Sequence, residues 1–185
     1  MRINALAYLN FHPCHLQSAS KLKKILLIMV HMGCEKKQKT IAIGPWGGLG
    51  ADCFDDGIYD GVRKITINYG RCINFIEIVY EKDCKQVVKS HGRVGGENTN
   101  QIELHFPGEF LTAMSGYYSP LQGNAGTGSP VIRSLTFETN RRTFGPFGVK
   151  EGTPFSLPMK GGKIVGLIGG SGWYLDAIGA HVEAL

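Results

Sequence analysis

The 185-residue sequence lacks the cysteine patterns that cross-link small secreted domains or hold zinc. Its five cysteines, Cys14, Cys34, Cys53, Cys72 and Cys84, are odd in number and contain no C-x-x-C spacing. Neither a disulfide framework nor a metal site is therefore predicted, and no cofactor is expected. The sequence also has no N-x-[ST] glycosylation acceptor. These absences favour reduced thiols and a cytoplasmic or nucleocytoplasmic location.

Long hydrophobic runs are missing as well. The apolar run Ile25–Val30 (ILLIMV) is too short to cross a bilayer or to form a good signal-peptide core. No membrane association is predicted. From Ile41 onward, no segment has a convincing 3.6-residue apolar period, so helices are not expected in the body of the chain.

Most of the chain has no net positive charge, although the calculated pI of the whole sequence is 9.0. Of the 20 Lys and Arg residues, seven lie within residues 1–40, which contain one of the 15 acidic residues. Residues 41–185 therefore carry 13 basic and 14 acidic side chains. A segment of this balance has no electrostatic reason to bind phosphate, so nucleic-acid binding is not predicted.

The basic residues 1–38 are separated in composition from the rest. We expect a disordered or weakly helical extension over 1–38, to which no function is assigned. An organellar transit peptide and upstream sequence before a start at Met32 stay open as alternatives. Residues 39–185 are expected to form one domain.

Glycine is abundant, with 26 residues spread through the chain without a collagen-like period. This distribution predicts many tight turns and therefore many short strands. Apolar and polar residues also alternate from Ile41 onward. For example, Ile65, Ile67 and Tyr69 fall on one face of a strand. The sequence predicts an all-β domain.

The alternating segments group into hairpins. "VRKITINYG" turns into "FIEIVY", "QIELHF" turns through "PGE" into "FLTAMSGYY", "RSLTFET" turns at "NRR", and "KIVGLIG" pairs with "YLDAIGAHV". One-sided alternation is typical of antiparallel sheets around a common core. The echoes "GPWGG" (44–48) and "GPFG" (145–148) suggest a repeated element, as in a prism or barrel of Greek keys.

Eight motifs of residues 39–185 occur in the order typical of one known family. They are "GPWGG", "FDDG", "GVRKI", "FPGEFL", "SGYY", "VIRSLTFETNRRTFGPFG", "GTPFSLP" and "GWYLDAIG". On these motifs the chain resembles the jacalin-related lectins, specifically their mannose-binding single-chain branch. The resemblance implies a β-prism I of three Greek-key four-stranded sheets with pseudo-threefold symmetry.

In that family the sugar site is a G-x-x-x-D loop, which residues 172–176 match as Gly-Trp-Tyr-Leu-Asp. The resemblance implies that Asp176 accepts hydrogen bonds from sugar hydroxyls, while the N–H groups of Trp173 and Tyr174 donate to sugar oxygens. We expect glycine at 172 to be a geometric need and the turn to project into solvent. Taken without the family, the same residues fit an ordinary hairpin turn with Trp173 capping the core.

Two departures from the family pattern concern neighbouring loops. The first loop of the family, "WGGxGG", ends here in Ala51, which keeps its N–H but disfavours a positive φ and would weaken a sugar contact. Some relatives carry a second G-x-x-x-D turn, which is replaced here by Gly70–Asn74, with the uncharged Asn74 and with Arg71 crowding the entrance. One sugar site per chain is therefore expected. The segment 116–130 either resembles the third binding-site loop of the family or is a plain surface loop.

The same resemblance predicts the partners. We expect mannose/glucose-type glycans and glycoproteins, because galactose-binding relatives gain a free amino terminus by cleavage before the first loop, whereas "KTIAIGPWGG" is uninterrupted. A shallow turn should bind a monosaccharide at about millimolar strength, roughly −4 kcal/mol. A homo-oligomer, a dimer or tetramer, is expected to supply avidity.

Catalysis is not expected. "GGSGW" lacks the last glycine of the G-x-S-x-G nucleophile elbow, which also requires a strand-to-helix turn. His91, His105 and His181 have no metal-like spacing. The adjacent Asp55 and Asp56 would point to opposite faces of a strand and could not form an acid and base pair.

One alternative without catalysis stays open. The chain could be a β-prism protein-interaction module with weakened or lost sugar binding. Ala51 and Asn74 are the two residues that support this alternative.

Overall fold

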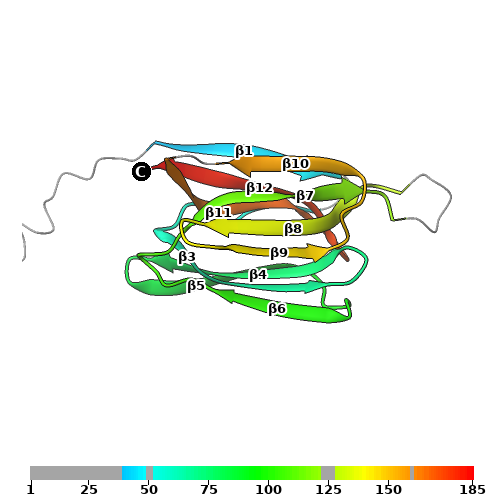
Figure 1. Ribbon diagram of the computed structural model, residues 1–185, viewed down its shortest axis with the longest axis horizontal. Coiled ribbons are helices and arrows are strands. Elements are labelled where there is room, and N and C mark those ends of the chain that lie inside the picture. Colours follow the sequence, from blue (N-terminus) through cyan, green and yellow to red (C-terminus); the bar gives the residue numbers. More distant parts are fainter. Residues whose placement is uncertain (1–38, 49–51, 122–127, 159–160) are drawn as a thin grey trace, which may run out of the picture. The chain divides into compact units, whose positions relative to one another are not determined.

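The computed structural model describes residues 39–48, 52–121, 128–158 and 161–185, shown in colour in Figure 1. All regular elements in these ranges are β-strands, and none of these residues forms a helix that could cross a membrane. The strands are β1 (Thr40–Gly47), β2 (Asp52–Asp55), β3 (Gly61–Tyr69), β4 (Ile73–Lys82), β5 (Lys85–Gly92), β6 (Asn98–Glu103), β7 (Leu111–Ser119), β8 (Val131–Thr139), β9 (Thr143–Gly148), β10 (Thr153–Pro158), β11 (Gly162–Ser171) and β12 (Leu175–Ala184).

The strands form three antiparallel sheets of four strands each. Their orders are β5-β4-β3-β6, β10-β7-β8-β9 and β1-β12-β11-β2. In the first two sheets, three consecutive strands pair in sequence and the fourth returns beside the first, which is a Greek key. The third sheet has the same order, but it joins the first two strands of the described chain to the last two. The predicted all-β fold of three Greek-key sheets is confirmed.

Three of the predicted hairpins are present. β3 pairs with β4, β8 with β9, and β11 with β12, all antiparallel. The predicted turn through "PGE" is wrong as a hairpin, because β6 pairs with β3 whereas β7 pairs with β8 and β10. Residues 104–110 therefore cross from one sheet to another. Alternation showed which face of β6 is buried, but it carried no information about the partner strand.

The two glycine-proline echoes occupy equivalent places. "GPWG" ends β1 and "GPFG" ends β9. Each of these strands follows a hairpin in sheet order, β11-β12-β1 and β7-β8-β9. The predicted repeated element is therefore confirmed in two of the three sheets.

The core receives side chains from all three sheets. Fully buried examples are Ile65 on β3, Ile78 on β4, Met114 on β7, Phe137 on β8 and Ile178 on β12. Burial of one such side chain contributes about 1.5–3 kcal/mol. Because every sheet buries one face here, the loops at the ends of the strands are fixed on a common scaffold.

Candidate functional site

The hairpin between β11 and β12 carries the predicted G-x-x-x-D motif. Ser171 pairs with Leu175, so Gly172, Trp173 and Tyr174 form the turn. Asp176 is the second residue of β12 and not part of the turn itself. Gly170 pairs with Ala177 and Ser171 with Leu175, so Asp176 is the extra, unpaired residue at a register shift between β11 and β12.

Two further loops contact this hairpin. The Gly48 N–H, directly after β1, donates to the Asp176 carbonyl at 2.9 Å. A Cβ at Gly48 would lie 2.2 Å from the Pro130 carbonyl oxygen and 2.4 Å from Ser129 Oγ. Residues 47–48, 129–130 and 172–176 therefore meet at one place, although they are far apart in the sequence.

The Asp176 carboxylate is half-buried, and the pKa of this group is raised above 3.8. Burial causes the increase, and the facing N–H of Gly172 partly offsets it. Tyr174 is also half-buried, whereas Trp173 is 70% exposed. The prediction that the whole turn projects into solvent is therefore wrong for Tyr174 and Asp176, because their side chains line a cavity.

Glycine is required near Asp176, but not at the predicted position. Gly47 has φ +124°, and a Cβ there would lie 2.2 Å from the Asp176 carbonyl oxygen. Gly172 has no positive φ, and the nearest atom to an added Cβ is Asp176 Oδ2 at 3.6 Å, an ordinary contact. The prediction that glycine is a geometric need at 172 is wrong. Its missing side chain instead leaves space beside the carboxylate.

An arginine that the motif did not indicate covers part of the turn. The Arg93 guanidinium lies over the Trp173 ring, 4.3 Å from its centroid, as a cation–π pair. Arg93 belongs to the connection between β5 and β6, on a different sheet. In the sequence, Arg93 stands between Gly92 and Gly95, and this pattern does not indicate Trp173 as its partner.

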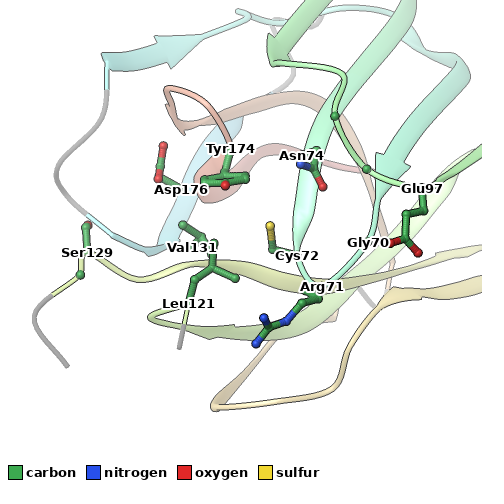
Figure 2. Close-up of a pocket in the computed structure, with 13 residues that line it drawn as sticks. Gly70, Arg71, Cys72, Asn74, Glu97, Leu121, Ser129, Val131, Tyr174 and Asp176 are labelled. Atoms are coloured by element: carbon green, nitrogen blue, oxygen red, sulfur yellow. The ribbon is translucent and has the colours of Figure 1, made fainter. Parts of the chain in front are cut away.

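A cavity of about 640 Å³ opens beside Asp176 (Figure 2). Tyr174 and Asp176 lie on one side of it, Gly70 and Glu97 on the opposite side, and Cys72 between them. The lining residues are Gly70, Arg71, Cys72, Asn74, Gly95, Gly96, Glu97, Leu121, Gly128, Ser129, Val131, Tyr174 and Asp176. Burial raises the pKa of the Cys72 thiol to about 11, so this group is uncharged at neutral pH.

The other residues predicted from the family pattern are placed as follows. Ala51 lies outside the described residues. Asn74 is buried, and its backbone carbonyl accepts the Arg93 N–H at 3.1 Å. Of the predicted loop 116–130, residues 116–119 belong to strand β7, and 122–127 lie outside the described residues. The hairpin 70–74 lines the same cavity as Asp176, which the sequence did not predict.

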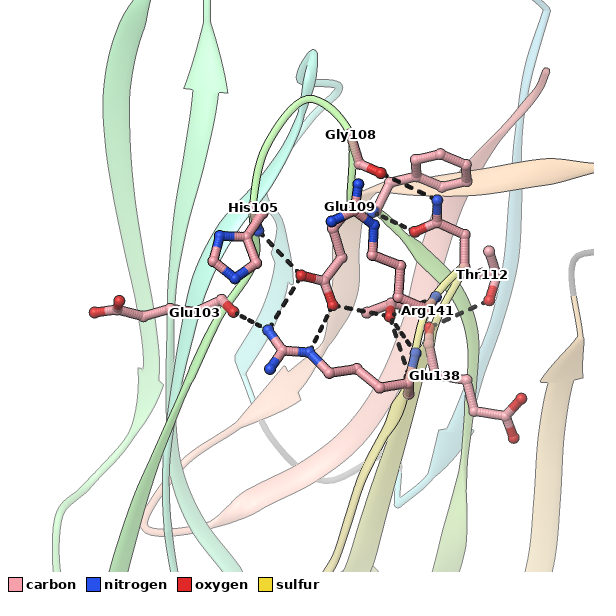
Figure 3. A network of polar contacts seen from close by, with 11 residues as sticks. Glu103, His105, Gly108, Glu109, Thr112, Glu138 and Arg141 are labelled. Carbon is pink, nitrogen blue, oxygen red and sulfur yellow. Dashed lines mark hydrogen bonds and ion pairs between the residues drawn. The ribbon is translucent and has the colours of Figure 1, made fainter.

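Another acidic side chain, Glu109, is structural and contrasts with Asp176. It is fully buried and accepts from Arg142 Nε at 2.8 Å, Thr139 Oγ1 at 3.0 Å and the His105 N–H at 3.1 Å (Figure 3). The hydrogen bond from Arg142 is the main cause that lowers its pKa to about 2. This network joins the crossing segment 104–110 to the β8–β9 hairpin.

The adjacent Asp55 and Asp56 point to different partners. Asp55 Oδ1 lies 2.7 Å from His181 Nε2, and this contact lowers the pKa of Asp55. Asp56 is buried, accepts from the Tyr80 hydroxyl at 2.6 Å and lies 2.8 Å from His91 Nε2. In the part of the chain that the structure describes, no group of three or more His, Cys, Asp or Glu side chains could hold a metal ion.

Comparisons with known proteins agree with this geometry. Residues 43–181 match the family described as the jacalin-like lectin domain. Jacalin-related lectin 19 of Arabidopsis thaliana is 50% identical over 148 residues, which cover 80% of this chain and 82% of the relative. A galactose-specific lectin of Morus indica is 39% identical over 152 residues, 79% of this chain and 94% of the relative.

A solved structure shares the fold. The mannose-binding lectin from champedak has a TM-score of 0.73 at 45% identity, covering 80% of this chain and 98% of that one. The three four-stranded sheets are therefore the sides of a β-prism I. Proteins of this family bind carbohydrate without catalysis. From the family match, the identity to its relatives and the shared fold, the chain belongs to the jacalin-related lectins.

Proposed function

We propose that the chain binds mannose/glucose-type glycans through the G-x-x-x-D hairpin. The observation that carries the proposal is the half-buried Asp176 carboxylate at the edge of the 640 Å³ cavity, beside the exposed Trp173. A carboxylate accepts two hydrogen bonds from neighbouring hydroxyls of one sugar. The N–H groups of Trp173 and Tyr174 donate to sugar oxygens, and an aromatic ring covers the apolar face of the pyranose.

Mannose is favoured over galactose by the first loop. Galactose-binding relatives gain a free amino terminus by cleavage before this loop, whereas the sequence "KTIAIGPWGG" that leads into it here is uninterrupted. The 45% identity to the mannose-binding lectin from champedak also supports this choice.

Retention on mannose-agarose tests the proposal. The protein should bind the column and elute with free mannose, while free galactose at the same concentration should leave it bound. Passage through the column without retention would favour the protein-interaction module. Elution by galactose alone would overturn the choice of sugar.

We also infer that the protein acts as a homo-oligomer, a dimer or tetramer. One shallow site of roughly −4 kcal/mol corresponds to about millimolar affinity, too weak to hold a glycoprotein by itself. Linked sites raise the overall avidity by about 10²–10⁴ without new contacts. Sedimentation velocity at micromolar protein should give a mass of at least two chains. A strictly monomeric profile would contradict this inference.

A further inference from the structure

We propose that another cavity, on the outer face of the sheet β5-β4-β3-β6, binds a small zwitterion such as a free α-amino acid. The ligand's carboxylate would lie at Arg63 and Lys64 and its ammonium group at Glu103. The cavity has a volume of about 310 Å³, and its lining residues are Arg63, Lys64, Val79, Gln86, Glu103 and Leu104. It has no described lining residue in common with the cavity beside Asp176, so this proposal does not depend on the glycan site.

The cavity lies on the side of the sheet that faces away from the core. Lys64 on β3 pairs with Val79 on β4 and with Glu103 on β6. The next residue of β3, Ile65, is fully buried in the core, and successive side chains of a strand point to opposite faces. The three paired residues therefore form a row across the outer face. The volume is at the lower end of the range of about 300–1,000 Å³ of ligand pockets, which suits one small molecule.

A β-bulge places two cationic side chains at this cavity. The pairing of β3 with β4 shifts between Val62 and Lys64, which leaves Arg63 as an extra residue. In a regular strand, Arg63 and Lys64 would point to opposite faces, whereas here both line the same cavity. The bulge thus brings the donors of both side chains together, as recognition of a carboxylate requires.

The fold accounts for the bulge but not for its charges. The hairpins β7–β8 and β11–β12 have a register shift at a comparable place, near the start of their first strand. The two residues at the shift are Thr112 and Ala113 in one hairpin, and Val165 and Gly166 in the other. None of these four is charged. The two adjacent cations on β3 are therefore not needed to form a sheet of this prism.

Arg63 is held in place by three contacts. Its Nε donates to the buried carboxylate of Glu81, and its guanidinium lies over the Phe106 ring, 5.0 Å from the centroid. The Arg63 carbonyl accepts the Leu104 N–H at 2.8 Å. The Arg63 side chain is 36% exposed, so its terminal N–H groups are accessible to a ligand. These contacts exist without a ligand, and such preorganisation lowers the entropic cost of binding.

Lys64 and Glu103 supply charges of opposite sign. They lie opposite each other on β3 and β6, yet neither forms an ion pair within the described residues. Arg142 Nη2 donates to the Glu103 carbonyl at 2.9 Å and holds the backbone at this place (Figure 3). Because Glu81 balances the charge of Arg63, the two remaining charges sum to zero. They therefore favour a ligand that carries both a carboxylate and an ammonium group.

Titration of the full chain with leucine, followed by NMR, tests the proposal. The backbone amide signals of Lys64 and Glu103 should shift and saturate, while those of Gly172 and Tyr174 should stay in place. Leucinamide lacks the carboxylate, and N-acetyl-leucine lacks the ammonium group. Each should bind at least about tenfold more weakly than leucine, which corresponds to the loss of one hydrogen bond between charged groups.

Substitutions of Lys64 test the site from the side of the protein. Lys64→Gln should weaken leucine binding by about tenfold or more, whereas Lys64→Arg should retain it, because the guanidinium also donates to a carboxylate. Lys150→Gln is the matched control, because it removes the same charge from an exposed residue that does not line the cavity. Signals that stay in place outside the cavity show that each variant is folded.

Three outcomes would overturn the proposal. They are equal binding of leucine and its two analogues, unchanged leucine binding in Lys64→Gln, and shifts limited to the hairpin 172–176. Binding of N-acetyl-leucine alone would show an anion site and contradict the role of Glu103. Retention on mannose-agarose does not involve this cavity, so either proposal can fail without the other.

Discussion

Two carboxylates in this domain show how the surroundings of a residue distinguish structure from function. Glu109 is fully buried, its oxygens accept several hydrogen bonds, and its pKa is lowered to about 2. Asp176 is only half-buried, and its pKa is raised because burial outweighs the single N–H that faces it. A carboxylate that is partly desolvated without being satisfied by the protein is suited to accept hydrogen bonds from a ligand.

Glycine substitutions should separate stability from binding around Asp176. Gly47→Ala places a Cβ 2.2 Å from the Asp176 carbonyl oxygen at φ +124°, so it should destabilise the domain by about 1–3 kcal/mol. Gly172→Ala places its Cβ 3.6 Å from Asp176 Oδ2, so stability should change by less than about 0.5 kcal/mol. The added methyl group would occupy space beside the carboxylate, and affinity for methyl α-mannoside should fall.

Thermal melts and calorimetry on the two variants check this pair of expectations. A Gly47→Ala variant with the melting temperature of the parent would contradict the close approach of Gly47 to the Asp176 carbonyl oxygen. A Gly172→Ala protein that binds sugar normally would show that the space beside the carboxylate is not used.

At the scale of single elements, the crossing from β6 to β7 depends on the Glu109 network. Residues 104–110 connect two sheets without forming a strand; at their ends, the Leu104 N–H donates to the Arg63 carbonyl at 2.8 Å and the Phe110 carbonyl accepts from the Asn140 N–H at 3.1 Å. Glu109 in this segment accepts from Thr139 and Arg142, at the end of β8 and in the turn that follows it. The network therefore adds side-chain hydrogen bonds to the few backbone hydrogen bonds that hold this segment.

Acid should weaken this connection. The folded-state pKa of Glu109, about 2, is below its ordinary value of 4.5, so its stabilisation is complete above pH 4.5 and is lost as the pH falls through about 2. Glu109→Gln should destabilise the domain by about 1.5–3 kcal/mol at pH 7, because hydrogen bonds to a charged group are lost. The difference from the parent should shrink toward pH 2.

Melting temperatures at pH 7, 4 and 2 measure this effect. Glu138→Gln is the control, because Glu138 is exposed on the neighbouring strand and forms no ion pair within the described residues. A constant difference between Glu109→Gln and the parent at all three pH values would contradict the account.

The elements also show how far the sequence could predict the molecule. Alternation in residues 62–70 and 133–139 was sufficient to identify strands and local hairpins, since these signals depend on neighbouring residues. Partners distant in the sequence could not be predicted from pattern alone, and the "PGE" turn was misinterpreted for this reason. For the site, the motif indicated Trp173, Tyr174 and Asp176, whereas Arg93 and the 70–74 hairpin reach it only through the arrangement of the sheets.

At the scale of the whole molecule, one sheet closes the domain and carries the proposed sugar hairpin. β1 pairs with β12 from Thr40 opposite Glu183 to Gly47 opposite Ala177, which joins the beginning of the described chain to its end. Because Asp176 directly precedes Ala177 on β12, this closure also positions the carboxylate. The sugar hairpin therefore depends on the completed domain.

Residues 39–185 should fold and bind sugar without residues 1–38. Described residues of 39–185 form all twelve strands of the three sheets and the core that they enclose. The truncated protein should keep the β-sheet circular dichroism of the full chain and its retention on mannose-agarose. Loss of either signal would show that the extension is needed.

The central claim is that the Asp176 carboxylate anchors the sugar, and the variant Asp176→Asn tests this claim most directly. The change replaces one acceptor oxygen by a donor, at a cost of about 1.5–3 kcal/mol for a hydrogen bond to a charged group. Against a total of roughly −4 kcal/mol, this loss should abolish measurable binding. Because the pKa of Asp176 is raised in the folded state, ionisation of this carboxylate lowers the free energy of unfolding at neutral pH. Removing the charge should therefore leave the melting temperature unchanged or slightly higher.

The measurement is titration calorimetry of Asp176→Asn with methyl α-mannoside, accompanied by a thermal melt at neutral pH. The account predicts no detectable binding in the variant and a melting temperature at or above that of the parent. Binding equal to that of the parent, or unfolding of the variant, would contradict the assignment of Asp176 as the anchor of the sugar.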